Sequence, residues 1–136
     1  MGDDTAPAAV VRRFIERGLG AGDLRAIADT LDPDVRYHGG VVGETTGSDD
    51  LLGTIVGYRD AFSDLGVSIE DQFGVGEKVC TRFIVSGVHT GDLADLEATG
   101  RRIELETINI TQVEDGRIVE VWAEADQLSL LEQLGL

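Results

Sequence analysis

The spacing of hydrophobic residues changes about halfway along this chain. Over the first 62 residues, apolar positions recur every three or four residues, which is typical of amphipathic helices. This spacing predicts helices at 6–19, 24–31 and 49–62, with a short strand at 35–38. From residue 67 onward, apolar and polar residues alternate, which is typical of half-buried strands. The pattern therefore predicts helices first and a run of strands afterwards.

The second half of the chain is predicted to contain four long strands, at 67–73, 78–89, 101–113 and 118–125. Glu114-Asp115-Gly116 forms the last hairpin turn, in which glycine supplies the positive φ. Beyond that strand the apolar spacing returns to about 3.6 residues, which predicts a closing helix. Long antiparallel strands that twist around helices form an open, cone-like barrel. We therefore predict one α+β domain over residues 1–136, with a curved antiparallel sheet packed on the N-terminal helices.

Charge is the compositional feature that changes this picture most. The chain has 26 acidic and 11 basic residues, a net charge of −15, and Lys78 is its one lysine. Nucleic acids and anionic membranes both favour surfaces rich in Lys and Arg, so neither is an expected partner. An acidic surface with almost no lysine suits a salt-rich cytoplasm, where salt screens self-repulsion. We therefore expect a halophilic source.

The location of the protein is predicted from what the chain does not contain. No apolar run approaches the ~20 residues that a membrane span needs. The first ten residues are acidic where a signal peptide would be basic, which favours a cytoplasmic protein. Two histidines 51 positions apart and a single cysteine, Cys80, provide no metal-ligand spacing. The glycines at 18–22 follow a predicted helix, whereas a dinucleotide-binding loop must follow a strand.

A polar row in the strand at 101–113 is the first candidate for chemistry. One face of this strand carries Thr107, Asn109 and Thr111. Such a polar row is expected if that face lines a cavity that binds polar groups. The neighbouring strand offers Trp122 and, at its junction with the closing helix, Asp126. The alternative is structural: threonine is a good strand former, Asn109 can face solvent, and Asp126 can cap the helix that follows it.

Three further residues are candidates on position alone. His38 ends the short first strand before a glycine-rich loop, where it either lines a mouth or lies on the surface. His89 ends the strand at 78–89, and a lone strand histidine is as readily structural as catalytic. Tyr58 belongs to the apolar stripe of the helix at 49–62.

Several segments resemble the SnoaL-like polyketide cyclases of the nuclear transport factor 2-like superfamily. They are YHG at 37–39, YRDAF at 58–62, VHTG at 88–91, RRIEL at 101–105, VEDGRIVEVW at 113–122, Asp126 and LEQLG at 131–135. The resemblance covers nearly the whole chain. It implies a cone of curved antiparallel sheet closed by helices, which agrees with the fold predicted from the residue pattern. It also implies a homodimer paired through the outer face of the sheet.

The resemblance also implies an activity. Such cyclases need no cofactor and close a ring by intramolecular aldol condensation of a polyketide ester. By this resemblance, Asp126 is the general acid/base that takes a proton from a carbon beside a carbonyl. Asn109 stands where the characterised pattern has histidine, so it can donate a hydrogen bond to an enolate but cannot carry a proton. The expected substrate-binding residues are Trp122, His38, His89, Tyr58 and Thr107.

Three functional hypotheses follow for the chain. The first is a cofactor-free enzyme of the lyase or isomerase type that abstracts a proton next to a carbonyl of a small, largely apolar substrate. The second is a binding protein that holds such a molecule without converting it. The third is an interaction scaffold that uses the outer sheet face, although this role would leave the polar inner row unexplained.

Overall fold

The computed structural model describes residues 5–136 and contains the predicted helices. The first helix begins as an α-helix and continues without a break as a π-helix. In order, the helices are α1 (Pro7–Arg13), η1 (Phe14–Gly20), α2 (Leu24–Thr30), α3 (Ser48–Ala61) and α4 (Gln127–Gln133). Asp23 starts α2 by accepting a hydrogen bond from the backbone N–H of Ala26 at 3.1 Å. None of the helices in residues 5–136 is long and apolar enough to cross a lipid bilayer.

Six strands form one sheet in the order β2-β1-β6-β5-β4-β3. Their bounds are β1 (Leu31–Gly39), β2 (Thr45–Thr46), β3 (Phe62–Val75), β4 (Lys78–His89), β5 (Arg102–Glu114) and β6 (Arg117–Ala125). Neighbouring strands are antiparallel except β1 and β6, which run parallel. The α+β fold with a curved sheet is therefore confirmed.

Two strands are longer than the residue pattern predicted, and each contains a register shift. β1 begins at Leu31 and passes through the predicted turn at 32–34, where its pairing with β6 shifts between Leu31 and Arg36. β3 begins at Phe62, directly after α3, and its pairing with β4 shifts between Ser63 and Gly66. A bulge interrupts the two-residue alternation from which a strand is recognised. The predicted starts were therefore too late.

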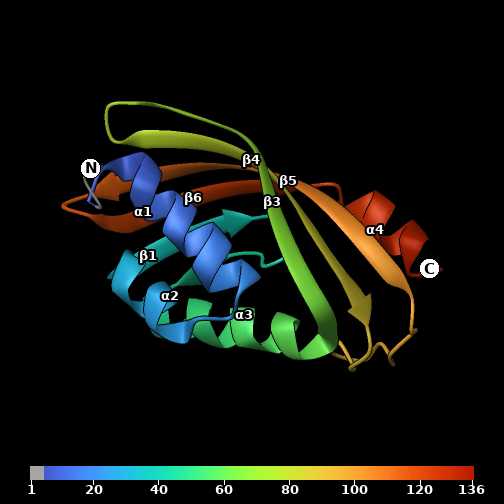
Figure 1. The fold of residues 1–136 in the computed structure, drawn as a ribbon. Helices are drawn as coiled ribbons and strands as arrows, with labels where there is room; N and C mark the ends of the chain where they lie inside the picture. The colour runs from blue at the N-terminus through green and yellow to red at the C-terminus, as the bar shows by residue number, and fades with distance from the viewer. Residues whose placement is uncertain (1–4) are drawn as a thin grey trace.

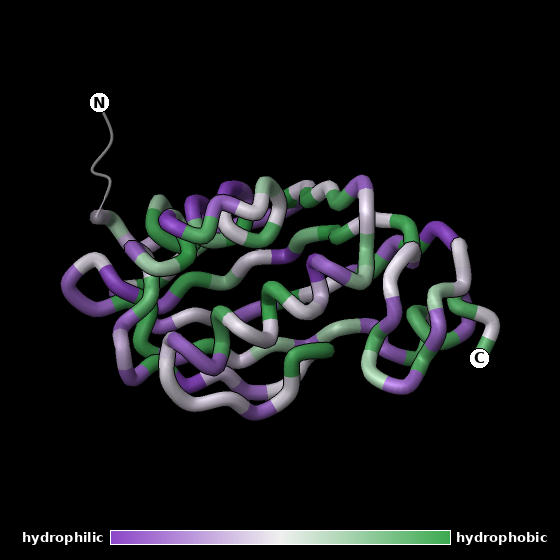
Figure 2. Tube along the Cα trace, turned by 90° about the horizontal axis from the view of Figure 1, so that it is seen from below, coloured by the Kyte–Doolittle hydropathy of each residue, from purple (hydrophilic) through white to green (hydrophobic). Residues whose placement is uncertain are grey.

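The helices cover the concave side of the sheet. Figure 1 shows α1 crossing the long strands, α3 running below them and α4 at the far end of the molecule. In Figure 2 the colour alternates along the strands, as expected for one buried and one exposed face. The buried residues from both layers form the main core: Val10, Val11, Phe14, Ile15, Ile27, Leu31, Val35, Tyr37, Leu51, Ile55, Val79, Phe83, Val113, Ile118, Val121 and Ala123.

A bulge in β6 decides which of its side chains face inward. Val113 pairs with Ile118 but Gln112 pairs with Glu120, so β6 contains one extra residue at this point. Ile118 therefore joins Val121 on the buried face, although simple alternation placed it on the opposite side. Trp122, beyond the bulge, faces outward.

Glutamine side chains hold α4 against β5 and against the loop after β1. The Gln133 side chain accepts from the backbone N–H of Glu104 at 2.7 Å and donates to its carbonyl at 2.8 Å. Gln127 donates to the carbonyl of Gly40 at 3.0 Å. Leu130 and the buried Leu134 pack inward from the same helix. The last segment of the chain therefore closes the space between sheet and helices.

Candidate binding and active site

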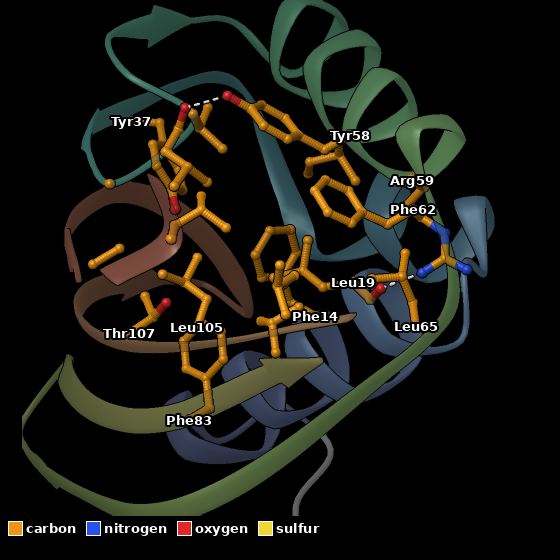
Figure 3. A pocket seen from close by; sticks show the side chains of 18 residues that line it. Phe14, Leu19, Tyr37, Tyr58, Arg59, Phe62, Leu65, Phe83, Leu105 and Thr107 are labelled. Atoms are coloured by element: carbon orange, nitrogen blue, oxygen red, sulfur yellow. Dashed lines mark hydrogen bonds between the residues drawn. The ribbon is translucent and has the colours of Figure 1, made fainter. Parts of the chain in front are cut away.

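The sheet and helices enclose a pocket of about 130 Å³. Figure 3 shows Tyr58 and Phe62 reaching in from the end of α3 and the start of β3, with Leu105 and Phe83 on the opposite strands. Most of the lining is apolar or aromatic: Phe14, Leu19, Gly40, Val41, Val42, Ile55, Phe62, Leu65, Phe83, Val85, Ile103, Leu105, Ala125 and Leu130. The lining residues with polar groups are Tyr37, Tyr58, Arg59 and Thr107. Such a pocket suits a largely apolar molecule.

Tyr58 and Thr107 lie where the sequence placed them, in the pocket wall. The Tyr58 hydroxyl donates to the carbonyl of Val41 at 2.5 Å, so it holds the loop after β1 against α3 (Figure 3). Burial raises the pKa of Tyr58 above its usual value, which keeps this hydroxyl protonated. Thr107 is buried on the inner face of β5.

Arg59 fastens two helices together at the edge of the pocket. Its Nη1 group donates to the carbonyls of Leu19 and of Gly20, the latter at 3.1 Å. These carbonyls lie at the C-terminal end of η1, where a helix carries partial negative charge. Gly22 packs against the guanidinium: a Cβ at this position would lie 2.7 Å from Nε of Arg59. The first contribution of Arg59 is therefore structural.

A buried pair, Tyr37 and Asn109, is the most distinctive polar feature of the site. Tyr37 of β1 lines the pocket and is 7% exposed, and Asn109 of β5 is 2% exposed. The strands β1 and β5 are separated by β6, on which Tyr37 pairs with Val121 and Asn109 pairs with Ala123. A Cβ on Gly40 would lie 3.1 Å from the Ala123 methyl group and 3.8 Å from the Tyr37 hydroxyl, so the ring of Tyr37 reaches along β6 towards the residue that pairs with Asn109.

The chemistry of this pair follows from its burial. Burial raises the pKa of Tyr37 to about 12, while a hydrogen bond from Asn109 acts in the opposite direction. The phenol is therefore neutral at physiological pH and keeps its proton to donate. Within residues 5–136, the side-chain oxygen of Asn109 is buried without a hydrogen-bond partner.

His89 lies behind the pocket wall. Its side chain is completely buried, and the ring packs against Phe62 with centroids 5.2 Å apart. The backbone N–H of Thr99 donates to Nδ1 at 3.1 Å, so the neutral ring carries its proton on Nε2. In the described part of the chain this Nε2 has no hydrogen-bond partner. His89 thus holds the segment after β4, and Phe62 separates it from the cavity.

His38 and Trp122 lie on the outer face of the sheet. The two ring nitrogens of His38 contact Glu44 and Glu120, each at 2.7 Å, and the ring stacks on Trp122 with centroids 5.9 Å apart. Hydrogen bonds to Glu120 and then Glu44 raise the pKa of His38. Trp122 is 38% exposed. The expected pocket positions of both residues are thus wrong: alternation along β1 and β6 turns them away from the cavity.

Asp126 also differs from the position expected of it. It is exposed, and its Oδ1 accepts from the backbone N–H of Ser129 at 3.1 Å. This is the helix-capping alternative that the sequence left open. The carboxylate is not part of the pocket wall, although the preceding residue, Ala125, is.

The structure therefore assembles a different set of groups from the one expected. Tyr58 and Thr107 line the pocket, and Asn109 borders it through Tyr37. Tyr37 was missed as a site residue, although alternation along β1 from the buried Val35 would have pointed it inward. The wall offers hydroxyl groups, whereas the carboxylate of Asp126, directly after β6, caps a helix.

Comparison with known proteins shows the same fold. IdmH from Streptomyces antibioticus, a candidate polyketide cyclase, is 29% identical, with a TM-score of 0.82 over 96% of this chain and 99% of its own. TsrD from Streptomyces laurentii is 27% identical, with a TM-score of 0.85 over 99% and 98%. A candidate polyketide cyclase from Bacillus cereus is 28% identical, with a TM-score of 0.79 over 96% and 81%. No curated protein matches this chain.

The sequence model of one family also matches the chain. It is the model of the SnoaL-like polyketide cyclases, and it matches residues 9–134. Its match covers the helices, the sheet and the closing helix that together build the pocket. The chain therefore belongs to the SnoaL-like polyketide cyclase family, within the nuclear transport factor 2-like superfamily.

Proposed function

We propose that the pocket binds a small, largely apolar molecule with a carbonyl group and promotes a cyclisation or isomerisation next to that carbonyl. The observation that carries this proposal is the buried phenol of Tyr37, with Asn109 behind it, in a wall that is mostly apolar. A neutral phenol in such surroundings is a strong hydrogen-bond donor to an oxygen on which negative charge develops. Family membership supports the same class of reaction.

The apolar wall is the second feature of the pocket that supports this proposed reaction. An aldol-type ring closure requires two carbons of one flexible molecule to meet, and a close-fitting cavity can hold the chain folded in that geometry. The aromatic rings of Phe14, Phe62 and Phe83 provide flat surfaces for such a molecule. Because the wall is mostly apolar, a hydrogen bond from Tyr37 is stronger than it would be in water.

The proton acceptor is a separate part of the proposal. Asp126 directly follows β6, one residue beyond Ala125 in the pocket wall. In the structure its carboxylate binds the N–H of Ser129 instead. We propose that Asp126 acts as the base only when the first turn of α4 moves, which would turn the carboxylate towards Ala125.

The second candidate function is binding without conversion. It is favoured by one observation, the absence of any carboxylate, imidazole or thiol among the residues of the described chain that line the pocket. Such a protein would use the Tyr37 hydroxyl only to orient its ligand.

A measurement of proton exchange at carbon distinguishes the two candidate functions. The probe is 2-tetralone, a small aromatic ketone, in D₂O, with NMR following the loss of the protons beside its carbonyl. If the protein is a catalyst, exchange is faster than in buffer, and Tyr37→Phe lowers the acceleration about 10- to 100-fold. Asp126→Asn, which preserves the cap, should abolish it. Binding without faster exchange would support the second candidate, and no binding would contradict both.

We also propose that two copies of the chain pair through the outer face of the sheet. Ile108 and Ile110 of β5 are 42% and 45% exposed there, and Ile110 pairs in register with Trp122 of β6. Adjacent exposed apolar side chains of this size commonly mark an interface.

A further inference from the structure

The loop between β1 and β2 forms one side of the pocket and has a backbone that can change conformation. We call residues 40–44 the flap: Gly40, Val41 and Val42 line the pocket, and the chain pairs with the sheet again at Thr45. Gly40 and Gly43 have φ angles of +60° and +78°, which glycine adopts without strain. The contacts that hold the flap against the sheet therefore control one wall of the cavity.

Within residues 5–136, three side chains from outside the flap hold it through polar contacts. Gln127 of α4 and Tyr58 of α3 donate to backbone carbonyls at its start, at 3.0 Å and 2.5 Å. Glu44, at its other end, contacts Nδ1 of His38 at 2.7 Å. An amide does not titrate, and burial raises the pKa of Tyr58 above its usual value. The contact between Glu44 and His38 is thus the attachment that a change of pH near neutrality can break.

His38 bridges two carboxylates, which a neutral imidazole ring cannot do. Its Nδ1 lies 2.7 Å from Oε2 of Glu44, and its Nε2 lies 2.7 Å from Oε2 of Glu120 on β6. An ionised carboxylate only accepts hydrogen bonds, and a neutral imidazole has one N–H to donate. Both contacts therefore form together when the ring carries two protons. The hydrogen bond to Glu120, and then that to Glu44, raises the pKa of His38.

Two cations lie beyond these carboxylates. Arg36 of β1 donates to Oε1 of Glu120 at 2.8 Å. Lys78 of β4 lies 5.5 Å from the centre of the Trp122 ring, on which His38 stacks. Both cations favour the neutral form of the imidazole. The pKa of His38 is raised nonetheless, so the two carboxylates outweigh them.

The two carboxylates differ in how firmly they are held. The side chain of Glu120 is 16% exposed and has Arg36 as a second partner. The side chain of Glu44 is 73% exposed, and in the described part of the chain its partner is His38. A neutral ring can donate to one carboxylate, and Glu44 is the one that can move into solvent. The remaining proton then stays on Nε2, towards Glu120.

We propose that doubly protonated His38 holds the flap against the sheet, and that loss of one proton releases the flap and opens the pocket to exchange of its contents. The sign follows from the folded state, which holds this proton more tightly than the unfolded chain does. The contact is therefore complete below the ordinary pKa of 6.5 and is lost as the pH rises through the pKa of the folded protein. The inference concerns access to the pocket and does not depend on the reaction proposed for it.

Benzene tests this access, because it has no ionisable group and binds in apolar cavities of similar size. By NMR exchange spectroscopy, we expect benzene to leave the wild-type protein about 2- to 5-fold faster at pH 9 than at pH 5.5, as suits an exposed ion pair. Glu44→Ala should release benzene at the faster rate at both pH values. Glu124→Ala, which removes another exposed carboxylate next to the pocket wall, should keep the wild-type difference.

Two measurements without benzene follow the flap and the ring separately. The backbone N–H of Gly43 donates to the carbonyl of Gly39 at 2.9 Å. Its protection from hydrogen exchange, relative to the free-peptide rate at the same pH, should fall over the same pH range. Trp122 is the one tryptophan of the chain, so its fluorescence reports the protonation of the stacked His38. Both signals should change at the same pH.

Three outcomes would overturn the inference. The first is equal protection of the Gly43 N–H at both pH values in the wild-type protein. The second is a pH dependence that Glu44→Ala retains, because another group would then be responsible. The third is a flap that loosens at pH 9 while benzene leaves no faster, which would show that molecules do not pass beneath it.

Discussion

A single methyl group makes the central contact of the site possible. Ala123 is 2% exposed and pairs with Asn109, two residues along β6 from Val121, the partner of Tyr37. A longer side chain there would fill the space beside the Tyr37 hydroxyl. The loop after β1 depends on the same residue, because a Cβ on Gly40 would lie 3.1 Å from the Ala123 methyl group. Ala123 therefore leaves room both for the Tyr37 hydroxyl and for the loop after β1.

The buried phenol predicts how stability depends on alkaline pH. Burial raises the pKa of Tyr37 from its ordinary 10.0 to about 12, so the folded protein holds this proton more tightly than the unfolded chain does. The resulting stability is complete below pH 10 and is lost as the pH rises through 12, by about 3 kcal/mol in all. Tyr37→Phe should show a smaller loss when the free energy of unfolding in urea is measured at pH 9 and pH 11. An equal loss in both proteins would show that the Tyr37 proton does not cause this loss of stability.

Segments of regular pattern could be predicted from the sequence, and interrupted ones could not. The strand β4 begins and ends where alternation places it, since its inward residues from Val79 to His89 continue without a break. β3 starts five residues earlier than predicted because the register shift after Ser63 hides the alternation. The residue pattern also could not predict the order of the strands in the sheet. The parallel pairing of β1 with β6 depends on packing across the whole domain.

The candidate site was predicted less well for a related reason. Spacing identified the polar row of Thr107, Asn109 and Thr111, which the structure buries on the inner face. It could not decide whether Asp126 caps a helix or faces a cavity, because both positions suit a carboxylate at the end of a strand. Tyr37 was overlooked because its partner Asn109 lies 72 positions away along the chain.

The junction between η1 and α3 gives a prediction at the scale of elements. Gly22 has a φ of +72°, and a Cβ there would meet the guanidinium of Arg59. We expect Gly22→Ala to lower the free energy of unfolding in urea by more than the ~1–2 kcal/mol of the left-handed conformation. In the double variant with Arg59→Ala, the loss should be smaller than the sum of the two single losses, because the collision is then absent.

Gly43→Ala is the matched control for this junction. Gly43 has a φ of +78°, but a Cβ there would have no atom within 4 Å. It therefore measures the cost of the backbone conformation alone. Additive losses for Gly22→Ala and Arg59→Ala would contradict the proposed contact.

The charge of the whole molecule governs its proposed pairing. Each chain carries a net charge of −15, so two copies repel one another at low salt. Salt at 1 M shortens the screening length to about 3 Å. We expect light scattering to show dimers at 2 M KCl and a weaker association at 0.1 M. Ile110→Asp should leave the protein monomeric at both, whereas Leu128→Asp, on the exposed side of α4, should not change the assembly. A monomer at 2 M KCl would contradict the interface.

The parallel pairing of β1 with β6 affects when the pocket can form during synthesis of the chain. Tyr37 lies 80 positions before Arg117, the first residue of β6, yet its strand can be placed only beside β6. Contacts between such distant segments form late, because a long loop must close first. During translation the pocket therefore stays open until β6 has left the ribosome. The packing of Tyr37 against β6 is among the last contacts to form.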